Sequence, residues 1–435
     1  MPMRIERYEL EAIQEPIVAA FAFKGRSSAK PMWNTAVQLH GAGFSAMGLS
    51  NQGVLWSDAA AYNALSHTGG NALMYLMTEF ALQRAKEIEF NHPVELLHAL
   101  LPEVWAYGKR VSRLPALRET FALNALVALD AAAWLLYARV NGIETFDALI
   151  PENVRPHMAA RHKKIAAIPL ITYSASMAEI LREANAGSFF LKIKIGADPE
   201  HDGDPEKMLA WDKARLRQIH EALCDRPCSY SENNRIPYYL DANGRYDTKE
   251  RLLRLLDYAD AIGALERIAL LEEPFPEQMK LDVRGIPVRL AADESAHSDM
   301  DVEERIALGY RAIALKPIAK TMSMTFDMIE VCAKHNIPCF CADLTVNAWM
   351  ADLNKNFAAR LPALPGLSVG LLESNGHQYY ARWREMCEAL PYPKGGWIHP
   401  RGGLYHLDAD FYRLSGGIFG EYGFYRAALS EETAI

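Results

Sequence analysis

Three stretches of the chain consist of a mainly apolar run followed by one or two charged residues and a final Pro or Ser: IALLEEP at 268–274, VRLAADES at 288–295 and AIALKP at 312–317. Five similar apolar runs surround them: IPLITYS (168–174), FFLKIKIG (189–196), PYYLDANG (237–244), PCFCADL (338–344) and LSVGLLES (367–374). Such runs are typical of buried parallel strands, and helix-like segments such as 247–256 and 326–335 separate most of them. Eight units over about 210 residues predict an α/β fold, a (β/α)8 barrel. A doubly wound sheet is the alternative, but no glycine-rich phosphate loop follows any run.

The regions on either side of the barrel have a different pattern. Residues 1–60 alternate like strands, and helical patterns follow at 58–107 and 119–141, so residues 1–150 predict an α+β capping domain. Within it we expect a long glycine-bearing loop around Gly25 to Gly53. The barrel is assigned to residues 165–375. The aromatic segment 376–435 has no room for further barrel units and is predicted to pack back on the capping domain.

Composition excludes several classes of protein. The 435 residues carry 46 Lys and Arg against 54 Asp and Glu, with no basic block, which argues against a nucleic-acid partner. The most apolar window, residues 121–138, is interrupted by Asn124 and Asp130, and we interpret it as a buried helix and not a membrane span. The N-terminus lacks the apolar stretch of a signal peptide. The six cysteines are expected to be reduced thiols, so we expect a cytoplasmic protein without a membrane partner.

Charged side chains follow five consecutive runs. They are Lys192, Lys194, Asp241, Asn243, Glu272, Glu273, Asp293, Glu294 and Lys316, with one amide among them. Barrel active sites collect at the carboxyl ends of the strands. Charged residues rarely end buried strands unless they are paired or bind something. These residues therefore form the candidate site, although a network of buried ion pairs without a metal is the alternative.

Strand geometry sorts the second and third runs. Side chains two residues apart share a face of a strand. Lys192 and Lys194 should therefore point in one direction, and so should Asp241 and Asn243.

The fourth and fifth runs end in adjacent acidic residues, which alternate between faces. Of Glu272 and Glu273, and of Asp293 and Glu294, only one member should face the barrel mouth, unless the strand end bends. The prolines that follow Glu273 and Lys316 bias both residues toward extended backbone. This supports Lys316 as a strand end.

Carboxylates on three neighbouring strands, flanked by lysines, form an all-oxygen site for a hard divalent cation. Mg²⁺ fits, with Mn²⁺ as the alternative ion, because it binds a few carboxylates and leaves positions for water or substrate. The metal would polarise a substrate carboxylate while a lysine removes the neighbouring proton. The lysine must be neutral for this step, and a nearby cation and a second lysine, such as Lys192 beside Lys194, should lower its pKa.

The ordered set K-I-K, D-A-N, E-E-P, A-D-E-S and L-K-P resembles the enolase superfamily, in its muconate-lactonizing-enzyme-like branch. The resemblance covers nearly the whole chain and implies a modified TIM barrel with a capping domain, one Mg²⁺ per subunit and a homo-oligomer. The residue roles that it implies are metal ligation by Asp241, Glu272 and Asp293, acid/base chemistry by Lys194 and Lys316, tuning by Lys192, and support by Asn243, Glu273 and Glu294.

At two positions the sequence departs from the patterns of related enzymes, and each departure argues against one class of reaction or substrate. The seventh run offers Asp343 but no His, and His335 precedes that run, which disfavours the His-base branch resembling mandelate racemase and its sugar-acid dehydratases. Dipeptide epimerases of this kind often carry a D-x-D pair at the eighth strand, where this chain has LLESN at 371–375. This argues against a dipeptide substrate. Glu373 could bind a substrate cation or hydroxyl or anchor a loop, and Asp343 and Tyr173 are further candidates for substrate binding.

The expected function is a racemase or epimerase that abstracts the proton α to the carboxylate of a small acid through a metal-stabilised enediolate. A lyase (dehydratase) or a cycloisomerase with the same first step is the alternative, and a non-catalytic binding protein ranks last. The loop from Lys24 to Trp56, with Trp33, His40 and Phe44, either closes over the site and selects substrate or is ordinary cap surface.

Overall fold

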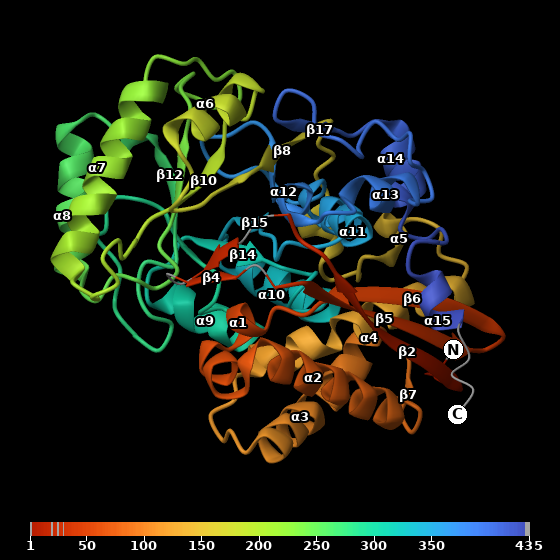
Figure 1. Cartoon of the computed structure of the whole chain (residues 1–435). Helices are drawn as coiled ribbons and strands as arrows, with labels where there is room; N and C mark the ends of the chain where they lie inside the picture. The colour runs from red at the N-terminus through yellow and green to blue at the C-terminus, as the bar shows by residue number, and fades with distance from the viewer. Residues whose placement is uncertain (1, 19–20, 24–25, 29, 431–435) are drawn as a thin grey trace.

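The computed structural model describes residues 2–18, 21–23, 26–28 and 30–430. Its centre is a ten-stranded sheet in the order β17-β8-β16-β15-β14-β13-β12-β11-β10-β9 (Figure 1). The strands are β8 (Lys164–Ile168), β9 (Leu170–Ile171), β10 (Leu191–Lys194), β11 (Tyr238–Asp241), β12 (Ile268–Glu272), β13 (Leu290–Ala292), β14 (Ala312–Leu315), β15 (Cys339–Cys341), β16 (Gly370–Glu373) and β17 (Leu404–His406). All eight predicted runs contain strand residues.

The sheet curls into a barrel because one run of chain joins its two sides. β8 pairs in parallel with β16, and β9, separated from β8 only by Pro169, pairs in parallel with β10. The Lys192 N–H donates to the Pro169 carbonyl over 3.1 Å at this junction. β17 adds an antiparallel strand beside β8. The architecture is a modified TIM barrel, and the predicted fold class is confirmed.

Helices follow most of the barrel strands. They are α6 (Met177–Asn185), α7 (Pro205–Leu223), α8 (Lys249–Ala261), α9 (Asp299–Ala307), α10 (Met322–Lys334) and α11 (Ala348–Ala358). Side chains of Asp204, Thr248 and Ser298 accept hydrogen bonds from the first turns of α7, α8 and α9, which fixes where these helices begin. Residues 273–289, between β12 and β13, form no helix. This missing helix and the added antiparallel strand β17 are two departures from a regular barrel.

The capping domain contains a three-stranded antiparallel sheet in the order β2-β5-β6. The strands of the whole domain are β1 (Met3–Arg4), β2 (Arg7–Glu15), β3 (Phe21–Phe23), β4 (Arg26–Ser28), β5 (Met32–Gly41), β6 (Phe44–Asn51) and β7 (Glu89–Phe90). β1 pairs with β7 and β3 pairs with β4 in two further sheets. Its helices are α1 (Val54–Ser57), α2 (Ala59–Ala85), α3 (Pro93–Ser112), α4 (Glu119–Val140) and α5 (Phe146–Leu149). The expected long loop around Gly25 to Gly53 is wrong over 32–51, which pairs as β5 and β6. Lys24 and Gly25 lie outside the described residues.

Helix α4 is the central helix of the capping domain. It ends at Val140, and Gly142 follows with a φ of 65°, a conformation typical of glycine just past the end of a helix. It is the one helix in the described ranges that is long and apolar enough to cross a membrane, but 94% of its most apolar window is buried inside the protein. The interpretation of residues 121–138 as a buried core helix is therefore confirmed.

Gly48 lies inside β6, within the region that the sequence predicts to be a loop. Figure 1 shows α4 lying against the cap sheet, and a Cβ at Gly48 would lie 2.2 Å from the Ala128 carbonyl oxygen and 2.4 Å from the Ala132 nitrogen. Both atoms belong to the backbone of α4, so neither can turn aside. Glycine is required here for close approach of helix and strand, and not for a turn.

Gly48→Ala is expected to destabilise the protein by about 1–3 kcal/mol or more, because the added methyl group overpacks a backbone contact. Urea denaturation followed by circular dichroism measures the change in free energy of unfolding. Gly423→Ala is the control, since a Cβ there meets nothing within 4 Å. Equal stability of the two variants would contradict this account of the contact between α4 and β6.

The C-terminal segment contacts both parts of the molecule. Its helices are α12 (Gly376–Tyr379), α13 (Trp383–Glu388), α14 (Ala409–Leu414) and α15 (Arg426–Ser430), and the chain also has short 3-10 turns at η1 (Arg155–Met158), η2 (Leu265–Arg267) and η3 (Ser415–Gly417). The Val18 N–H donates to the Tyr379 carbonyl over 2.8 Å, and α15 lies against β2 and β5 of the cap. β17 instead joins the barrel sheet. The segment therefore ties the cap to the barrel.

Candidate active site

The two lysines of β10 point in the same direction, as strand alternation predicts. Lys192 Nζ lies 3.0 Å from Asp241 Oδ2, 2.9 Å from Glu272 Oε1 and 3.0 Å from Glu373 Oε2. Lys194 Nζ lies 2.6 Å from Asp241 Oδ2 and also donates to Asn243 Oδ1. Asp241 and Asn243 therefore share a face as well. The carboxyl ends of β10, β11, β12 and β16 meet at this cluster.

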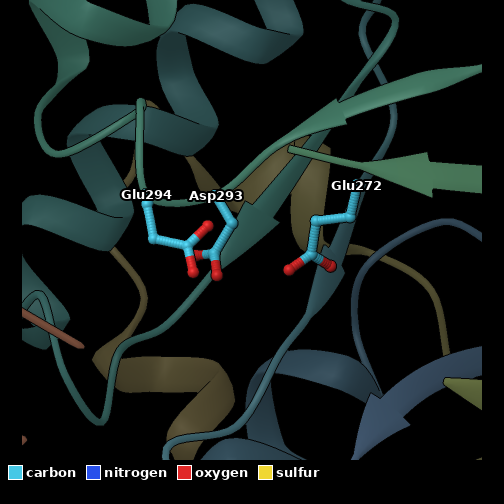
Figure 2. A group of neighbouring side chains, drawn as sticks. All are labelled: Glu272, Asp293 and Glu294. Atoms are coloured by element: carbon cyan, nitrogen blue, oxygen red, sulfur yellow. The ribbon is translucent and has the colours of Figure 1, made fainter. Parts of the chain in front are cut away.

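Three carboxylates converge where β12 and β13 end. One oxygen from each of Glu272, Asp293 and Glu294 lies within 4.8 Å of the others, and all three residues are buried (Figure 2). β13 ends at Ala292, so the chain has already left the strand at Asp293 and Glu294, and both side chains line the same cavity. The bent strand end, left open from the sequence, is the geometry found.

This group differs from the set that the resemblance implies. Glu294, expected to support the ligands, belongs to the converging group, while Asp241 lies beside Glu272 and accepts hydrogen bonds from two lysines. The donors are carboxylate oxygens without nitrogen or sulfur, and they are buried and close together. Such a set fits a hard divalent cation such as Mg²⁺. Glu272 and Asp293 belong to both sets.

Glu273 supports the loop that carries Asp293. Its Oε2 accepts hydrogen bonds from the Asp293 N–H over 2.8 Å and from the Ser295 N–H over 3.2 Å. The prediction of extended backbone here is wrong, because Glu273 has a φ of 41°. Its N–H still pairs with the Ala291 carbonyl at 2.9 Å, so bonds between strands override the preference set by the following proline. Burial, reinforced by Glu294, raises the pKa of Glu273 to about 8.

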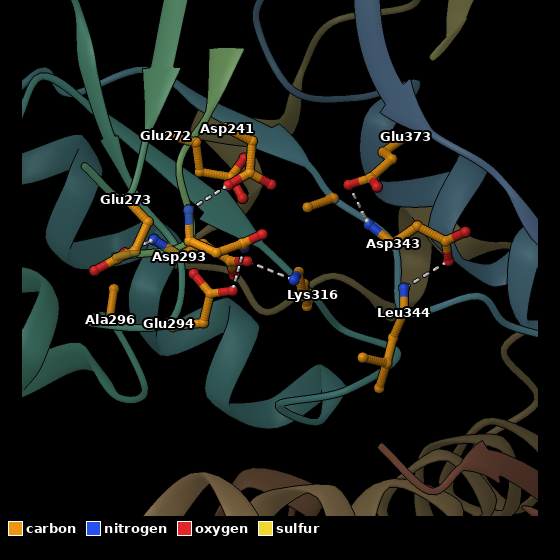
Figure 3. Close-up of polar contacts among 12 residues, drawn as sticks. Asp241, Glu272, Glu273, Asp293, Glu294, Ala296, Lys316, Asp343, Leu344 and Glu373 are labelled. Atoms are coloured by element: carbon orange, nitrogen blue, oxygen red, sulfur yellow. Dashed lines mark hydrogen bonds and ion pairs between the residues drawn. The ribbon is translucent and has the colours of Figure 1, made fainter. Parts of the chain in front are cut away.

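Lys316 lies on the side of the barrel opposite β10. It follows β14, the sixth of eight parallel strands, whereas β10 is the second. Strands four places apart face each other across an eight-stranded barrel. Lys316 Nζ lies 2.5 Å from Asp293 Oδ2, and Figure 3 shows its side chain directed at Asp293. The two predicted acid/base lysines therefore flank one cavity from opposite sides.

Lys320 was missed by the sequence reasoning. Its Nζ donates to the Asp293 carbonyl over 2.8 Å and to the Ala296 carbonyl over 2.7 Å, and it lies 3.3 Å from Asp293 Oδ1. The side chain is fully buried. Lys320 lies in the turn before α10, where no strand-end pattern marks it. The one sequence signal for Lys320 is its position four residues after Lys316.

Carboxylates raise the pKa of two buried lysines of the site, Lys192 and Lys316. Burial alone would lower the pKa of Lys192, but Asp241, Glu272 and Glu373 outweigh it and raise the pKa well above its usual value. Burial is likewise outweighed at Lys316, where Asp293 raises the pKa. At these two lysines the contacts with carboxylates therefore favour the charged form.

The seventh and eighth strands contribute Asp343 and Glu373 to the cavity wall. The Asp343 N–H donates to Glu373 Oε2 over 3.1 Å, and Asp343 Oδ2 accepts the Asn375 N–H over 2.9 Å (Figure 3). Burial, followed by repulsion from Glu373, raises the pKa of Asp343 to about 7. Tyr173 is not brought to the cavity, because its hydroxyl donates to the Ile195 carbonyl over 3.3 Å and it is absent from the lining.

The cap closes the cavity from the other side. The cap residues that line it are Met32, Gln52, Gly53, Val54, Leu55, Trp56, Tyr62 and His67. Trp33, His40 and Phe44 do not line it; His40 pairs with Glu9 at 3.1 Å and Phe44 is 47% exposed. Of the two alternatives for these three residues, the structure favours cap surface. The end of the same segment, at Trp56, does reach the site.

Comparisons with known proteins agree with this architecture. Residues 176–364 match the family model described as "Enolase C-terminal domain-like". No curated protein matches the sequence. The structure resembles a mandelate racemase/muconate lactonizing enzyme from Roseiflexus sp., with 18% identity, 96% of this chain and 98% of that chain covered, and a TM-score of 0.62.

Two further solved structures have the same arrangement. A mandelate racemase/muconate lactonizing protein from Herpetosiphon aurantiacus is 19% identical over 94% of this chain and 97% of that chain, with a TM-score of 0.61. A dipeptide epimerase from Enterococcus faecalis V583, complexed with Mg and L-Leu-L-Tyr, is 16% identical over 86% and 90%, with a TM-score of 0.58. The chain thus has the fold of the mandelate racemase/muconate lactonizing enzyme proteins, and residues 176–364 of it match the enolase C-terminal domain-like model.

Proposed function

We propose that the protein is a Mg²⁺-dependent enzyme of the enolase superfamily that removes the proton α to the carboxylate of a small acid and returns it as a racemase or epimerase. The observation that carries the proposal is the placement of Lys194 and Lys316 on opposite sides of one cavity that Asp293 and Glu294, two members of the buried acidic group, also line. Two opposed amines can reach opposite faces of one carbon.

The proton transfers are assigned to these two lysines. One of them, in its neutral form, takes the α proton, and the other, in its ammonium form, delivers a proton to the opposite face. The substrate therefore changes configuration without changing composition. The chemistry that a divalent cation supplies, when held by Glu272 and Asp293 with a third carboxylate, is stabilisation of the charge that develops on the substrate carboxylate.

Lys192 has a different role in this proposal. Its ammonium group contacts three carboxylates, and these contacts favour its charged form over the neutral form that a base requires. We assign it to orienting Asp241 and Glu272, and to attracting the anionic substrate together with Lys194.

The ion pair between Lys316 and Asp293 favours a second candidate reaction. Lys316 Nζ lies 2.5 Å from Asp293 Oδ2, a contact that favours the ammonium form. An ammonium group that never loses its proton would stabilise charge without exchanging protons, as a dehydratase or cycloisomerase with a single base at Lys194 requires. The products separate the two reactions, because elimination loses water and cycloisomerisation forms a ring, while epimerisation does neither.

A screen of small carboxylic acids in D₂O with Mg²⁺ tests the proposal. We expect at least one acid to lose its α-proton signal in ¹H NMR and to gain about one mass unit as deuterium replaces hydrogen. Exchange should stop with EDTA and return when excess Mg²⁺ is added. Absence of exchange with every acid, together with no heat of Mg²⁺ binding in calorimetry, would contradict the proposed function.

A further inference from the structure

Two polar side chains, Asn124 and Asp130, interrupt the apolar helix α4 of the cap, and both are buried. Burying a polar group costs free energy unless the group finds hydrogen-bond partners. Burial also raises the pKa of Asp130 to about 7, so the helix carries a carboxyl group where its charged form is disfavoured. Both side chains bond to groups outside α4, and these partners indicate what the two residues do.

Asp130 binds the first turn of α10 in the barrel. Its Oδ2 accepts the Met322 N–H over 2.8 Å and the Ser323 N–H over 3.2 Å, and the Ser323 hydroxyl donates to Oδ1. Trp134, also on α4, donates its indole N–H to the Ser323 hydroxyl oxygen over 2.9 Å. The first N–H groups of a helix have no partner inside it and carry partial positive charge, so a carboxylate is stabilising there. A cap helix thus holds the start of a barrel helix.

This turn of α10 is continuous with the two lysines beside the acidic group. Residues 316–321 join β14 to α10 and include Lys316 and Lys320. The Lys320 N–H donates to the Lys316 carbonyl over 2.7 Å, which ties both lysines into one turn. Asn124 Nδ2 of α4 lies 3.5 Å from the Ala319 carbonyl oxygen in the same segment. Helix α4 therefore contacts the segment itself and the helix turn that follows it.

The last residue of this segment has an unfavourable backbone conformation. Thr321, directly before α10, has a φ of 74°, which is rare for a β-branched residue. Residues in such conformations persist only where the surrounding contacts fix them. Here Thr321 Oγ1 accepts the Met324 N–H over 3.1 Å, and Asp130 binds the two residues that follow Thr321. The bonds from α4 therefore help to fix a turn that is unfavourable on its own.

The other side of the segment holds the loop that carries Asp293. Lys320 Nζ donates to the carbonyls of Asp293 and Ala296 over 2.8 and 2.7 Å. Lys316 Nζ lies 2.5 Å from Asp293 Oδ2. A displacement of residues 316–321 would therefore move a predicted acid/base group and disturb a carboxylate of the converging acidic group at the same time.

We propose that Asp130 is a positioning residue for Lys316. By holding the start of α10 it fixes residues 316–321, and this segment places Lys316 in the cavity and binds the Asp293 loop through Lys320. The kinetic part of this inference rests on the proposed function. The hold on the segment is a property of the folded protein and can be measured without substrate.

Amide hydrogen–deuterium exchange, followed by mass spectrometry of the full-length protein, tests the hold on the segment. In Asp130→Ala, amides of residues 316–325 should exchange at least about tenfold faster, because hydrogen bonds to a charged group are lost. Amides of α8, residues 249–261, should keep the wild-type rate. Asp130→Asn, which keeps an oxygen acceptor on a side chain of the same size, should stay close to wild type.

Asp204→Ala is the matched control. Asp204 Oδ1 accepts the Glu206 and Lys207 N–H groups at the start of α7, so it makes the same kind of contact with a barrel helix, but it does not line the cavity. This variant should loosen α7 and leave amide exchange of residues 316–325 unchanged.

The second readout is kcat for α-proton exchange, with an acid that the wild-type protein exchanges in D₂O. A misplacement of about 1 Å in an active site can cost on the order of a hundredfold in rate, so kcat of folded Asp130→Ala should fall about ten- to a hundredfold. Asp204→Ala should lose stability in urea and keep its kcat. Circular dichroism shows whether each variant folds. If Asp130→Ala does not fold, Ser323→Ala replaces it, since it removes the hydroxyl bonds to Asp130 and Trp134 and should change both readouts in the same direction.

Two results would overturn the inference. Unchanged amide exchange of residues 316–325 would show that the carboxylate of Asp130 does not hold the segment. Faster amide exchange with an unchanged kcat would show that the contact stabilises the fold without positioning Lys316. A wild-type protein that exchanges no acid would instead contradict the proposed function, and the amide measurement would still decide whether Asp130 holds the segment.

Discussion

Replacing either Lys194 or Lys316 by alanine is expected to abolish the interconversion of stereoisomers and to leave α-proton exchange for only one of them. Each lysine serves one face of the substrate carbon, because the two lie at the ends of the second and sixth strands across the cavity. Removal of a general base costs about a hundred- to ten-thousandfold in rate. The exchange that survives should use the remaining lysine, which takes and returns the proton on its own face.

The measurement follows each pure stereoisomer in D₂O by ¹H NMR, with optical rotation for interconversion. Lys194→Ala should stop exchange from one isomer and Lys316→Ala from the other. Lys355→Ala is the matched control, since Lys355 is also a buried lysine, paired with Asp352 at 2.7 Å, but it does not line the cavity. It should lose stability and keep both exchange reactions. Full exchange from both isomers in either site variant would remove that lysine from the mechanism.

Loss of exchange from one isomer alone would also decide between the two candidate reactions. A racemase needs both lysines to change protonation state. In each lysine variant, therefore, a different stereoisomer should fail to exchange its α proton. In the dehydratase or cycloisomerase alternative, Lys316 stays an ammonium group. Lys316→Ala would then slow the reaction without producing a stereoisomer-specific loss of exchange.

The fold was predictable because barrel strands carry a strong local signal. Runs that are apolar on both faces indicate buried parallel strands, and parallel strands present their carboxyl ends at one rim. The sequence neighbours of Lys194, Asp241, Glu272 and Lys316 were therefore enough to place these residues together. In the cap, a glycine such as Gly48 that allows close contact with a helix cannot be distinguished in the sequence from a glycine in a loop.

Residues away from the strand ends could not be found in this way. Lys320 lies in a turn, and Trp56 comes from a different part of the molecule, so only tertiary packing brings them to Asp293 and Lys316. Glu273 shows a related limit. A local rule about the residue before proline fails when backbone hydrogen bonds to the neighbouring strand fix another conformation.

The identity of the third carboxylate ligand of the cation, beside Glu272 and Asp293, depends on where β13 ends. Strand alternation allows only one of two adjacent acidic residues to face the barrel mouth. Because β13 ends at Ala292, Asp293 and Glu294 escape that rule and both reach the cavity. Asp241, which the family resemblance favours, accepts hydrogen bonds from Lys192 and Lys194 at 3.0 and 2.6 Å. Asp293 also contacts two lysines, so what separates Asp241 from it is that Asp241 lies outside the converging group of Glu272, Asp293 and Glu294.

Substitution of the carboxylates should therefore rank them by their effect on cation affinity. Asp293→Asn and Glu294→Gln are expected to weaken Mg²⁺ binding by more than about a hundredfold, beyond the roughly 10- to 100-fold cost of losing an outer hydrogen-bond partner of a metal ligand. Asp241→Asn should stay within that smaller range, since its carboxylate lies outside the converging group. Calorimetry with Mg²⁺ and electron paramagnetic resonance with Mn²⁺ give the dissociation constants without substrate.

The control separates ligation from general charge effects. Asp343→Asn removes a buried carboxylate from the same cavity but outside the converging group, and it should change cation affinity little. Circular dichroism must first show that Asp293→Asn folds, because this variant leaves Lys316 and Lys320 without their shared buried carboxylate. If Asp241→Asn lost affinity as strongly as Asp293→Asn while Glu294→Gln kept it, the ligand set would be Asp241, Glu272 and Asp293. Binding of the cation would then have to displace two lysines from Asp241, which would release Lys194 for proton transfer.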